Sequence, residues 1–98
     1  MNNDVIKQKD VMIRLLEALF PQVKIYLFGS RAKGTHRPSS DIDLALDAGR
    51  QLSFLEIAKA KNVLDALNIA EKIDVVDMRS IPEALKETIL QEGIIWKS

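Results

Sequence analysis

Residues 23–46 read VKIYLFGSRAKGTHRPSSDIDLAL and contain two strand patterns joined by a polar loop. The stretch 23–28 is rich in β-branched and aromatic residues, and Gly29-Ser30 closes it, so it predicts a strand that runs into a turn. Residues 31–40 include one glycine, one proline, two serines and a threonine, with Ala32 as the one apolar residue, which predicts a long loop with a short helical turn at its start. Acidic and aliphatic residues then alternate over 41–46, as in a half-buried strand.

A helical pattern precedes this stretch and another follows it. Apolar residues recur at spacings of three and four after Asp4, which can cap the helix, and continue to Phe20, before Pro21 stops it. Ser53-Phe54-Leu55-Glu56 has the spacing of a capping box, and it predicts a second helix that runs to about Asn68. Both helices have one apolar side, so each is expected to pack against a sheet.

The last third of the chain contains further strand and helix patterns. Lys72–Asp77 predicts a third strand, and Ser80-Ile81-Pro82-Glu83 has capping-box spacing for a third helix that runs to about Gln91. Gly93 can end that helix in the left-handed conformation, and Ile94–Trp96 is then a final short strand or an apolar tail, with Trp96 in the core or at an interface. Because a loop alone joins the first two strands and helices separate the later ones, we expect an α+β fold, a small mixed sheet with helices packed on one face.

Composition limits the kinds of protein that this chain can be. With 98 residues, 47% of them hydrophobic, we expect one domain over residues 1–98 with a modest core. The absence of Cys excludes disulfides, thiolate zinc sites and cysteine nucleophiles. Fourteen basic and fourteen acidic residues cancel, so nucleic acid is not an expected partner. No run is apolar enough for a membrane span or a signal peptide, which predicts a cytoplasmic protein.

Asp41 and Asp43 form the strongest candidate for a functional pair. Alternate residues of a strand share a face, so the two carboxylates are expected to point the same way about 6.6 Å apart along the backbone. Two such negative charges repel each other, and aspartate is depleted in strands. The pair therefore costs stability unless a cation lies between the two carboxylates. Mg²⁺ suits two carboxylates, whereas zinc prefers His or Cys ligands, and the chain has one His and no Cys.

The preceding loop offers groups that suit a phosphate. Gly29 lets backbone approach a ligand closely, and Ser30 supplies a hydroxyl and an N–H at the start of a helical turn. Arg31, Lys33 and Arg37 form a dense group of positive charge in the same loop. We therefore expect a polyphosphate to bind here, with Arg31 as the leading candidate among the three cations.

A third carboxylate is expected from the third predicted strand. Strand parity places Asp74 with Val76 and on the face opposite Asp77, so Asp74 converges with Asp41 and Asp43 if this strand pairs with the second. Strand register is not visible in the sequence, and Asp77 therefore stays open as the alternative.

Gly29-Ser30, ten intervening residues and Asp41-Ile42-Asp43 resemble the signature of the DNA polymerase β-like nucleotidyltransferase superfamily. Gly-Ser-Arg-Ala-Lys-Gly followed by Ser-Asp-Ile-Asp-Leu-Ala is similar to its minimal nucleotidyltransferase (MNT) branch, and the resemblance spans the whole chain. It implies the fold of that superfamily, with Gly29 and Ser30 on the nucleotide phosphates. It also implies two Mg²⁺ ions, one held by Asp41, Asp43 and Asp74 and the other by Asp41 and Asp43.

The resemblance further implies an activity and a partner. Members of the MNT branch act as antitoxins that transfer AMP from ATP to a tyrosine hydroxyl of a helical HEPN ribonuclease, and larger relatives carry an additional domain for the acceptor. We therefore expect a protein adenylyltransferase that assembles with a HEPN-type protein, with a homodimer as a further possibility.

Two other kinds of function remain open at this point. One is a non-catalytic antitoxin that inhibits its partner by occlusion. The other is a nucleotidyltransferase that acts on RNA or on a small molecule, although a neutral chain with 5% aromatic residues lacks the usual features of a single-strand binder.

Overall fold

The computed structural model describes residue 6 and residues 8–35 and 40–98. Its elements in chain order are α1 (Lys9–Leu19), β1 (Lys24–Phe28), α2 (Ser30–Lys33), β2 (Ile42–Asp47), α3 (Phe54–Asp65), β3 (Ile73–Asp77), α4 (Glu83–Glu92) and β4 (Ile94–Lys97). All the predicted strands and helices are present, and the helical turn expected at the start of the loop is α2. Asp4, the predicted cap of the first helix, and Arg37 lie outside the described residues.

The four strands form one mixed sheet in the order β3-β2-β1-β4. β1 pairs antiparallel with β2, to which the segment 29–41 with α2 joins it, and also with β4, which follows α4 at the end of the chain. β2 and β3 are parallel, and α3 makes the crossover that a parallel pair requires. The mixed sheet and the α+β class are therefore confirmed.

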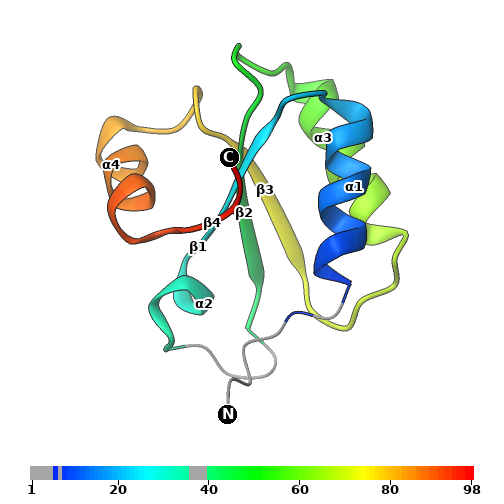
Figure 1. Ribbon diagram of the computed structural model, residues 1–98, viewed down its shortest axis with the longest axis horizontal. Helices are drawn as coiled ribbons and strands as arrows, with labels where there is room; N and C mark the ends of the chain where they lie inside the picture. The colour runs from blue at the N-terminus through cyan, green and yellow to red at the C-terminus, as the bar shows by residue number, and fades with distance from the viewer. Residues whose placement is uncertain (1–5, 7, 36–39) are drawn as a thin grey trace.

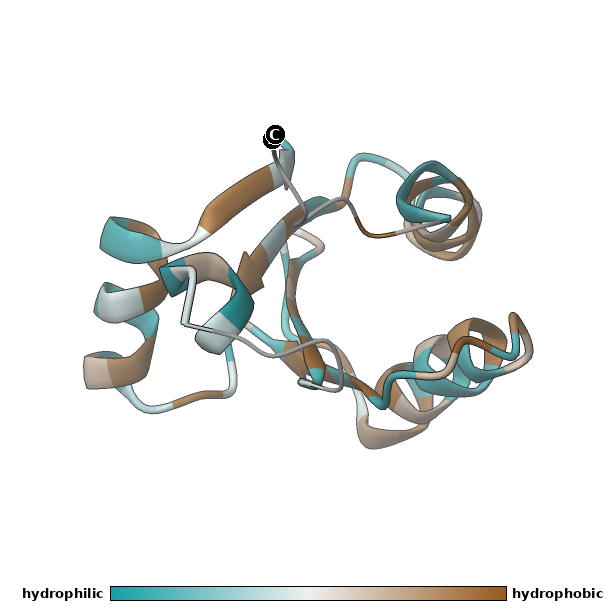
Figure 2. Ribbon diagram, turned by 90° about the horizontal axis from the view of Figure 1, so that it is seen from below, coloured by the Kyte–Doolittle hydropathy of each residue, from teal (hydrophilic) through white to brown (hydrophobic). Residues whose placement is uncertain are grey.

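Two helices, α1 and α3, lie on one face of the sheet. Figures 1 and 2 show them side by side, and their buried residues Met12, Leu16, Ala60 and Leu64 join the inward side chains of the strands in the larger core. β2 contributes Ile42, Leu44 and Leu46 to this core, which is the parity that the alternating pattern predicted. Trp96 is partly buried and packs against the same core, with the Lys9 ammonium 5.5 Å from its ring centroid.

The opposite face of the sheet is also covered. The sequence predicted helices on one face, which is correct for α1 and α3, whereas α4 packs on the other face. Figure 2 shows α4 across the sheet from them, and a second cluster of buried residues consists of Ala45, Met78 and Ile89. Tyr26 and Phe28 of β1 pack against this cluster. Because Tyr26 and Phe28 make one face of β1 apolar opposite its core face, that face also needs a helix over it.

Three local signals have different outcomes in the structure. The capping box at Ser53 and Glu56 is confirmed, since Ser53 Oγ accepts from the Glu56 N–H at 3.1 Å and Glu56 Oε1 accepts from the Ser53 N–H at 2.9 Å. The capping box at Ser80 is wrong, because the Ser80 hydroxyl donates instead to Asp77 Oδ2 at 2.8 Å and α4 begins without a side-chain cap.

Gly93 is extended, with φ −71° and ψ 159°, and the predicted left-handed conformation is wrong. Its glycine identity has another cause: a Cβ there would lie 2.5 Å from the Ile89 carbonyl oxygen and 3.2 Å from that of Leu27. Within the described residues, no helix has the length and apolar character to cross a bilayer.

We expect Ile89→Ala to lower the free energy of unfolding by about 3 kcal/mol, because it removes the buried anchor of α4 and leaves a cavity. Urea denaturation followed by circular dichroism measures this change. The neighbouring variant Leu90→Ala is the control, since Leu90 is 55% exposed and should cost less than about 0.5 kcal/mol. Equal losses in the two variants would contradict the packing of α4 on the sheet.

Candidate active site

Three carboxylates converge on the face of the sheet that α4 covers. Asp43 in β2 is in register with Asp74 in β3, and Asp41 lies just before β2 at the same parity as Asp43. One oxygen from each of the three side chains lies within 4.8 Å of the other two. The structure thus brings together the residues that the sequence predicted as a set.

The environment of Asp43 disfavours its negative charge. Burial raises the pKa of Asp43 above its ordinary value of 3.8, and the charges of Asp74 and Asp41 raise it further, while Lys72 opposes them. Lys72 Nζ lies 3.8 Å from Asp74 Oδ1, and both side chains are well exposed. The sequence motifs did not mark Lys72 as a residue of the site. Its position two residues before Asp74 gives it the same strand parity, which was the available signal.

The three oxygens are hard ligands, and their number and spacing fit the needs of a Mg²⁺ ion. Within the described residues, Lys72 is the sole cation paired with any of them, so much of their charge is left uncompensated. A divalent cation would remove the repulsion that raises the pKa of Asp43.

Gly29 lies at the end of β1 directly against Asp43. Its φ of +79° is a conformation that few residues other than glycine adopt, and a Cβ at this position would overlap the Asp43 carboxylate. Phe28, the residue before it, is in register with Asp43 across the sheet. Glycine is therefore needed here both for the turn into α2 and for the close approach of the Asp43 side chain.

Ser30 begins α2 immediately after Gly29, close to the acids and half-buried. Lys33 and Arg31 point to different surroundings. Lys33 Nζ lies 3.9 Å from Glu92 Oε1 at the end of α4, whereas Arg31 is buried and bonds to Ser40 and Glu71. Of the two cations of this group that the structure describes, Arg31 is the buried one, a difference that the sequence pattern does not predict.

Asp77 lies on the other face of β3 from Asp74, as its parity predicted, and is buried. Its carboxylate accepts from the Leu52 N–H at 2.9 Å, the Ser80 hydroxyl at 2.8 Å and the Arg79 N–H at 3.1 Å. These bonds tie the segment before α3 to the turn after β3, so Asp77 has a structural role and does not join the three acids.

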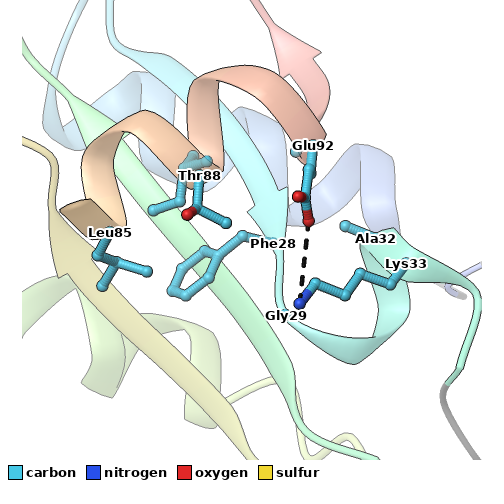
Figure 3. A pocket seen from close by; sticks show the side chains of 9 residues that line it. Phe28, Gly29, Ala32, Lys33, Leu85, Thr88 and Glu92 are labelled. Atoms are coloured by element: carbon cyan, nitrogen blue, oxygen red, sulfur yellow. Dashed lines mark ion pairs between the residues drawn. The ribbon is translucent and has the colours of Figure 1, made fainter.

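A mostly apolar pocket of about 200 Å³ opens beside Gly29, between α2 and α4. Figure 3 shows Phe28, Leu85 and Thr88 around it, with the Lys33–Glu92 ion pair at its edge. The lining residues of α4 carry no sequence signal that separates them from ordinary core positions.

We expect Gly29→Ala to abolish divalent-cation binding, because the added Cβ would displace the Asp43 carboxylate. Gly34→Ala is the control: Gly34 also has a positive φ, +76°, but its ψ is 12°, and no atom lies within 4 Å of its added Cβ. Gly34→Ala should lose about 1 kcal/mol of stability from strain in the left-handed region. Gly29→Ala should lose more, because the ψ of Gly29 is −156°, which with a positive φ is a conformation almost confined to glycine. Calorimetric titration of Mn²⁺ separates them, and equal metal affinities in the two variants would contradict the role assigned to Gly29.

Asp43→Asn should stabilise the metal-free protein at pH 7 by about 0.5 kcal/mol, because it removes a carboxylate whose ionisation is disfavoured. The native state holds this proton more tightly than the unfolded state, so the stability of wild type relative to Asp43→Asn should fall as pH rises from 3.8 through the raised pKa of Asp43. The difference between the two proteins isolates Asp43 from Asp47 and Glu56, whose lowered pKa values have the opposite effect. Below 3.8 the two proteins should converge. Urea denaturation in EDTA between pH 3 and 8 tests this, and a variant that is less stable at pH 7 would contradict it.

Comparison with known proteins identifies relatives of this chain. The chain is 30% identical over 92 residues to the probable protein adenylyltransferase MntA of Haemophilus influenzae, with 92% of this chain and 81% of the relative covered. It is 36% identical over 87 residues to the protein adenylyltransferase MntA of Shewanella oneidensis, which covers 84% of this chain and 59% of that longer protein.

Solved structures agree with the sequence relatives. A crystal structure of a toxin–antitoxin with AMP-PNP superposes with a TM-score of 0.77 at 32% identity, over 90% of this chain and 71% of that one. A tri-AMPylated Shewanella oneidensis HEPN toxin in complex with MNT antitoxin gives a TM-score of 0.71 at 28% identity, over 91% and 68% of the two chains. The Polymerase beta nucleotidyltransferase profile matches residues 12–98, which include both strands that carry the carboxylates, and the chain therefore belongs to that family.

Proposed function

We propose that this protein is a Mg²⁺-dependent adenylyltransferase that transfers AMP from ATP to a tyrosine hydroxyl of a helical HEPN-type partner and thereby acts as an antitoxin. The observation that carries the proposal is the convergence of the Asp41, Asp43 and Asp74 carboxylates beside Gly29-Ser30. The relatives named protein adenylyltransferase and the related toxin–antitoxin complexes support the choice of reaction and partner.

Asp41, Asp43 and Asp74 would hold the metal, one ion by all three side chains and a second by Asp41 and Asp43. Bound Mg²⁺ supplies positive charge that offsets the triphosphate and the leaving pyrophosphate and makes the acceptor hydroxyl more acidic. The three side chains keep a fixed spacing because β2 and β3 hold them in register. The metal-free site is thus already shaped for its ligand, which lowers the cost of binding.

Gly29 and Ser30 would receive the phosphates of ATP, Gly29 through close backbone approach and Ser30 through its hydroxyl and N–H. In the reaction the acceptor oxygen bonds to the α-phosphorus, the bond from that phosphorus to the β-phosphate oxygen breaks, and pyrophosphate leaves. The hydroxyl proton passes to water, and Asp74 ranks second as its acceptor because a metal-bound carboxylate is a weak base. Because the proposed reaction uses ATP, the cytoplasm is the proposed location of the protein.

A protein partner also agrees with the surface of the chain. Leu90, Ile94 and Ile95 are 55%, 44% and 60% exposed, and they lie on α4 and the edge strand β4. Exposed apolar side chains at the edge of a sheet are a common feature of surfaces that bind another protein. A hetero-oligomer with the HEPN protein is therefore the proposed assembly, with a homodimer as the lesser alternative.

The proposal predicts that the purified chain, incubated with Mg·ATP and a HEPN-type partner, adds AMP to a tyrosine of that partner. Intact-mass and peptide mass spectrometry detect the adduct, and EDTA should abolish it. Asp43→Asn and Asp74→Asn should lower the rate by more than about a hundredfold, because each removes a metal ligand. Asp10→Asn, on the exposed side of α1, is the control and should react as wild type does.

The same experiment separates the alternatives. A partner that is neutralised equally by wild type and Asp43→Asn without any adduct would favour inhibition by occlusion. Extension of labelled RNA by the isolated chain would favour an RNA substrate. Either result would overturn the proposed protein adenylylation.

A further inference from the structure

We propose that Arg31 is a positioning residue that fixes the three acidic side chains relative to one another, and does not contact the nucleotide. The inference rests on the proposed function, because it assigns a role within the same metal site. This role differs from the one expected from the sequence, in which Arg31 binds the polyphosphate.

Burial separates Arg31 from the other cation of α2 that the structure describes. The Arg31 side chain is 7% exposed, whereas that of Lys33 is 55% exposed and faces α4, as Figure 3 shows. Arg31 instead lines a cavity of about 380 Å³ together with Ile6, Asn68 and Glu71. Ile6 belongs to the core on the α1 and α3 side of the sheet, whereas the carboxylates lie on the α4 side.

The guanidinium group is anchored first to the segment that leads into β2. Arg31 Nε and Nη2 donate to the Ser40 carbonyl oxygen at 3.2 Å and 3.1 Å. Ser40 directly precedes Asp41, so this pair of bonds fixes the backbone from which the Asp41 side chain projects. Because Asp41 lies before the first residue of β2, the sheet alone does not hold it in place.

The same group reaches the segment that leads into β3. Arg31 Nη2 lies 3.5 Å from Glu71 Oε2, and Glu71 is followed by Lys72, whose carbonyl accepts from the Ile42 N–H at 2.8 Å. One side chain therefore connects α2, which follows Gly29, to the segments that precede Asp41 and Asp74. These are the three segments that carry the candidate site.

A planar guanidinium is suited to this task. Its fork of N–H groups serves a carbonyl and a carboxylate at fixed angles, whereas an ammonium provides one compact centre on a flexible stem. Arg31→Lys preserves the charge and loses the fork. A phosphate contact would tolerate that change in part, and a positioning role would not.

The test is Mn²⁺ binding without nucleotide, measured by calorimetry in the full chain under conditions where each variant shows a cooperative unfolding transition. Arg31→Lys should weaken Mn²⁺ binding about tenfold, the usual effect of losing a residue that orients metal ligands. Lys33→Ala, which removes a charge from the same helix, should leave the metal affinity within about twofold of wild type, because it bonds to none of the segments that carry the acids.

Glu71→Gln is the second variant, for use if Arg31→Lys does not fold, since Glu71 is 26% exposed and its substitution should leave the protein folded. It should weaken Mn²⁺ binding by a smaller factor, about threefold. Wild-type affinity in Arg31→Lys, or in Glu71→Gln where the first variant is unfolded, would overturn the positioning role. Absence of Mn²⁺ binding in the wild type would instead overturn the proposed function.

Discussion

The parallel pairing of β2 with β3 is the constraint on which the rest of the structure depends. It sets Asp43 directly opposite Asp74, and Asp41 then adds a third negative charge at the same edge. Like charges placed opposite one another destabilise a sheet, and the pKa of Asp43 is raised first by burial and then by the charges of Asp74 and Asp41. Apolar packing on the other face of both strands offsets the repulsion, because Ile42, Leu44 and Ile73 are almost completely buried there.

The division of labour between the two faces follows from the same pairing. α3 makes the crossover and packs with α1 over the larger core, which leaves the acidic side of β2 and β3 partly open. On that side α4 covers Tyr26, Phe28 and Ala45, nearer to β1, and stops short of the carboxylates. The site is thus the part of β2 and β3 that, within the described residues, α4 leaves uncovered, and these two strands position every acid except Asp41.

Much of this arrangement could be predicted from residue patterns, and the failures have identifiable causes. Strand parity placed Asp74 and Asp77 on opposite faces, and the structure agrees, because period-two alternation depends on local backbone geometry alone. The capping box at Ser80 failed because a buried carboxylate from outside the motif, Asp77, takes the hydroxyl. The packing of α4 on the second face of the sheet was not predicted, because the apolar residues of a helix do not indicate which face of a sheet the helix packs against.

Arg31 shows most clearly what a sequence pattern leaves undetermined. A cation beside a candidate phosphate loop suits two roles, a ligand contact or an internal brace, and composition does not distinguish them. Burial does, because an arginine with its guanidinium removed from solvent must satisfy its donors within the protein, and those acceptors then become fixed in turn. Ser40 and Glu71 are the acceptors here, and each lies just before a strand that carries an acid. The repulsion within the acidic cluster is therefore opposed by an electrostatic tie on the other side of the sheet, which allows three like charges to stay within reach of one cation.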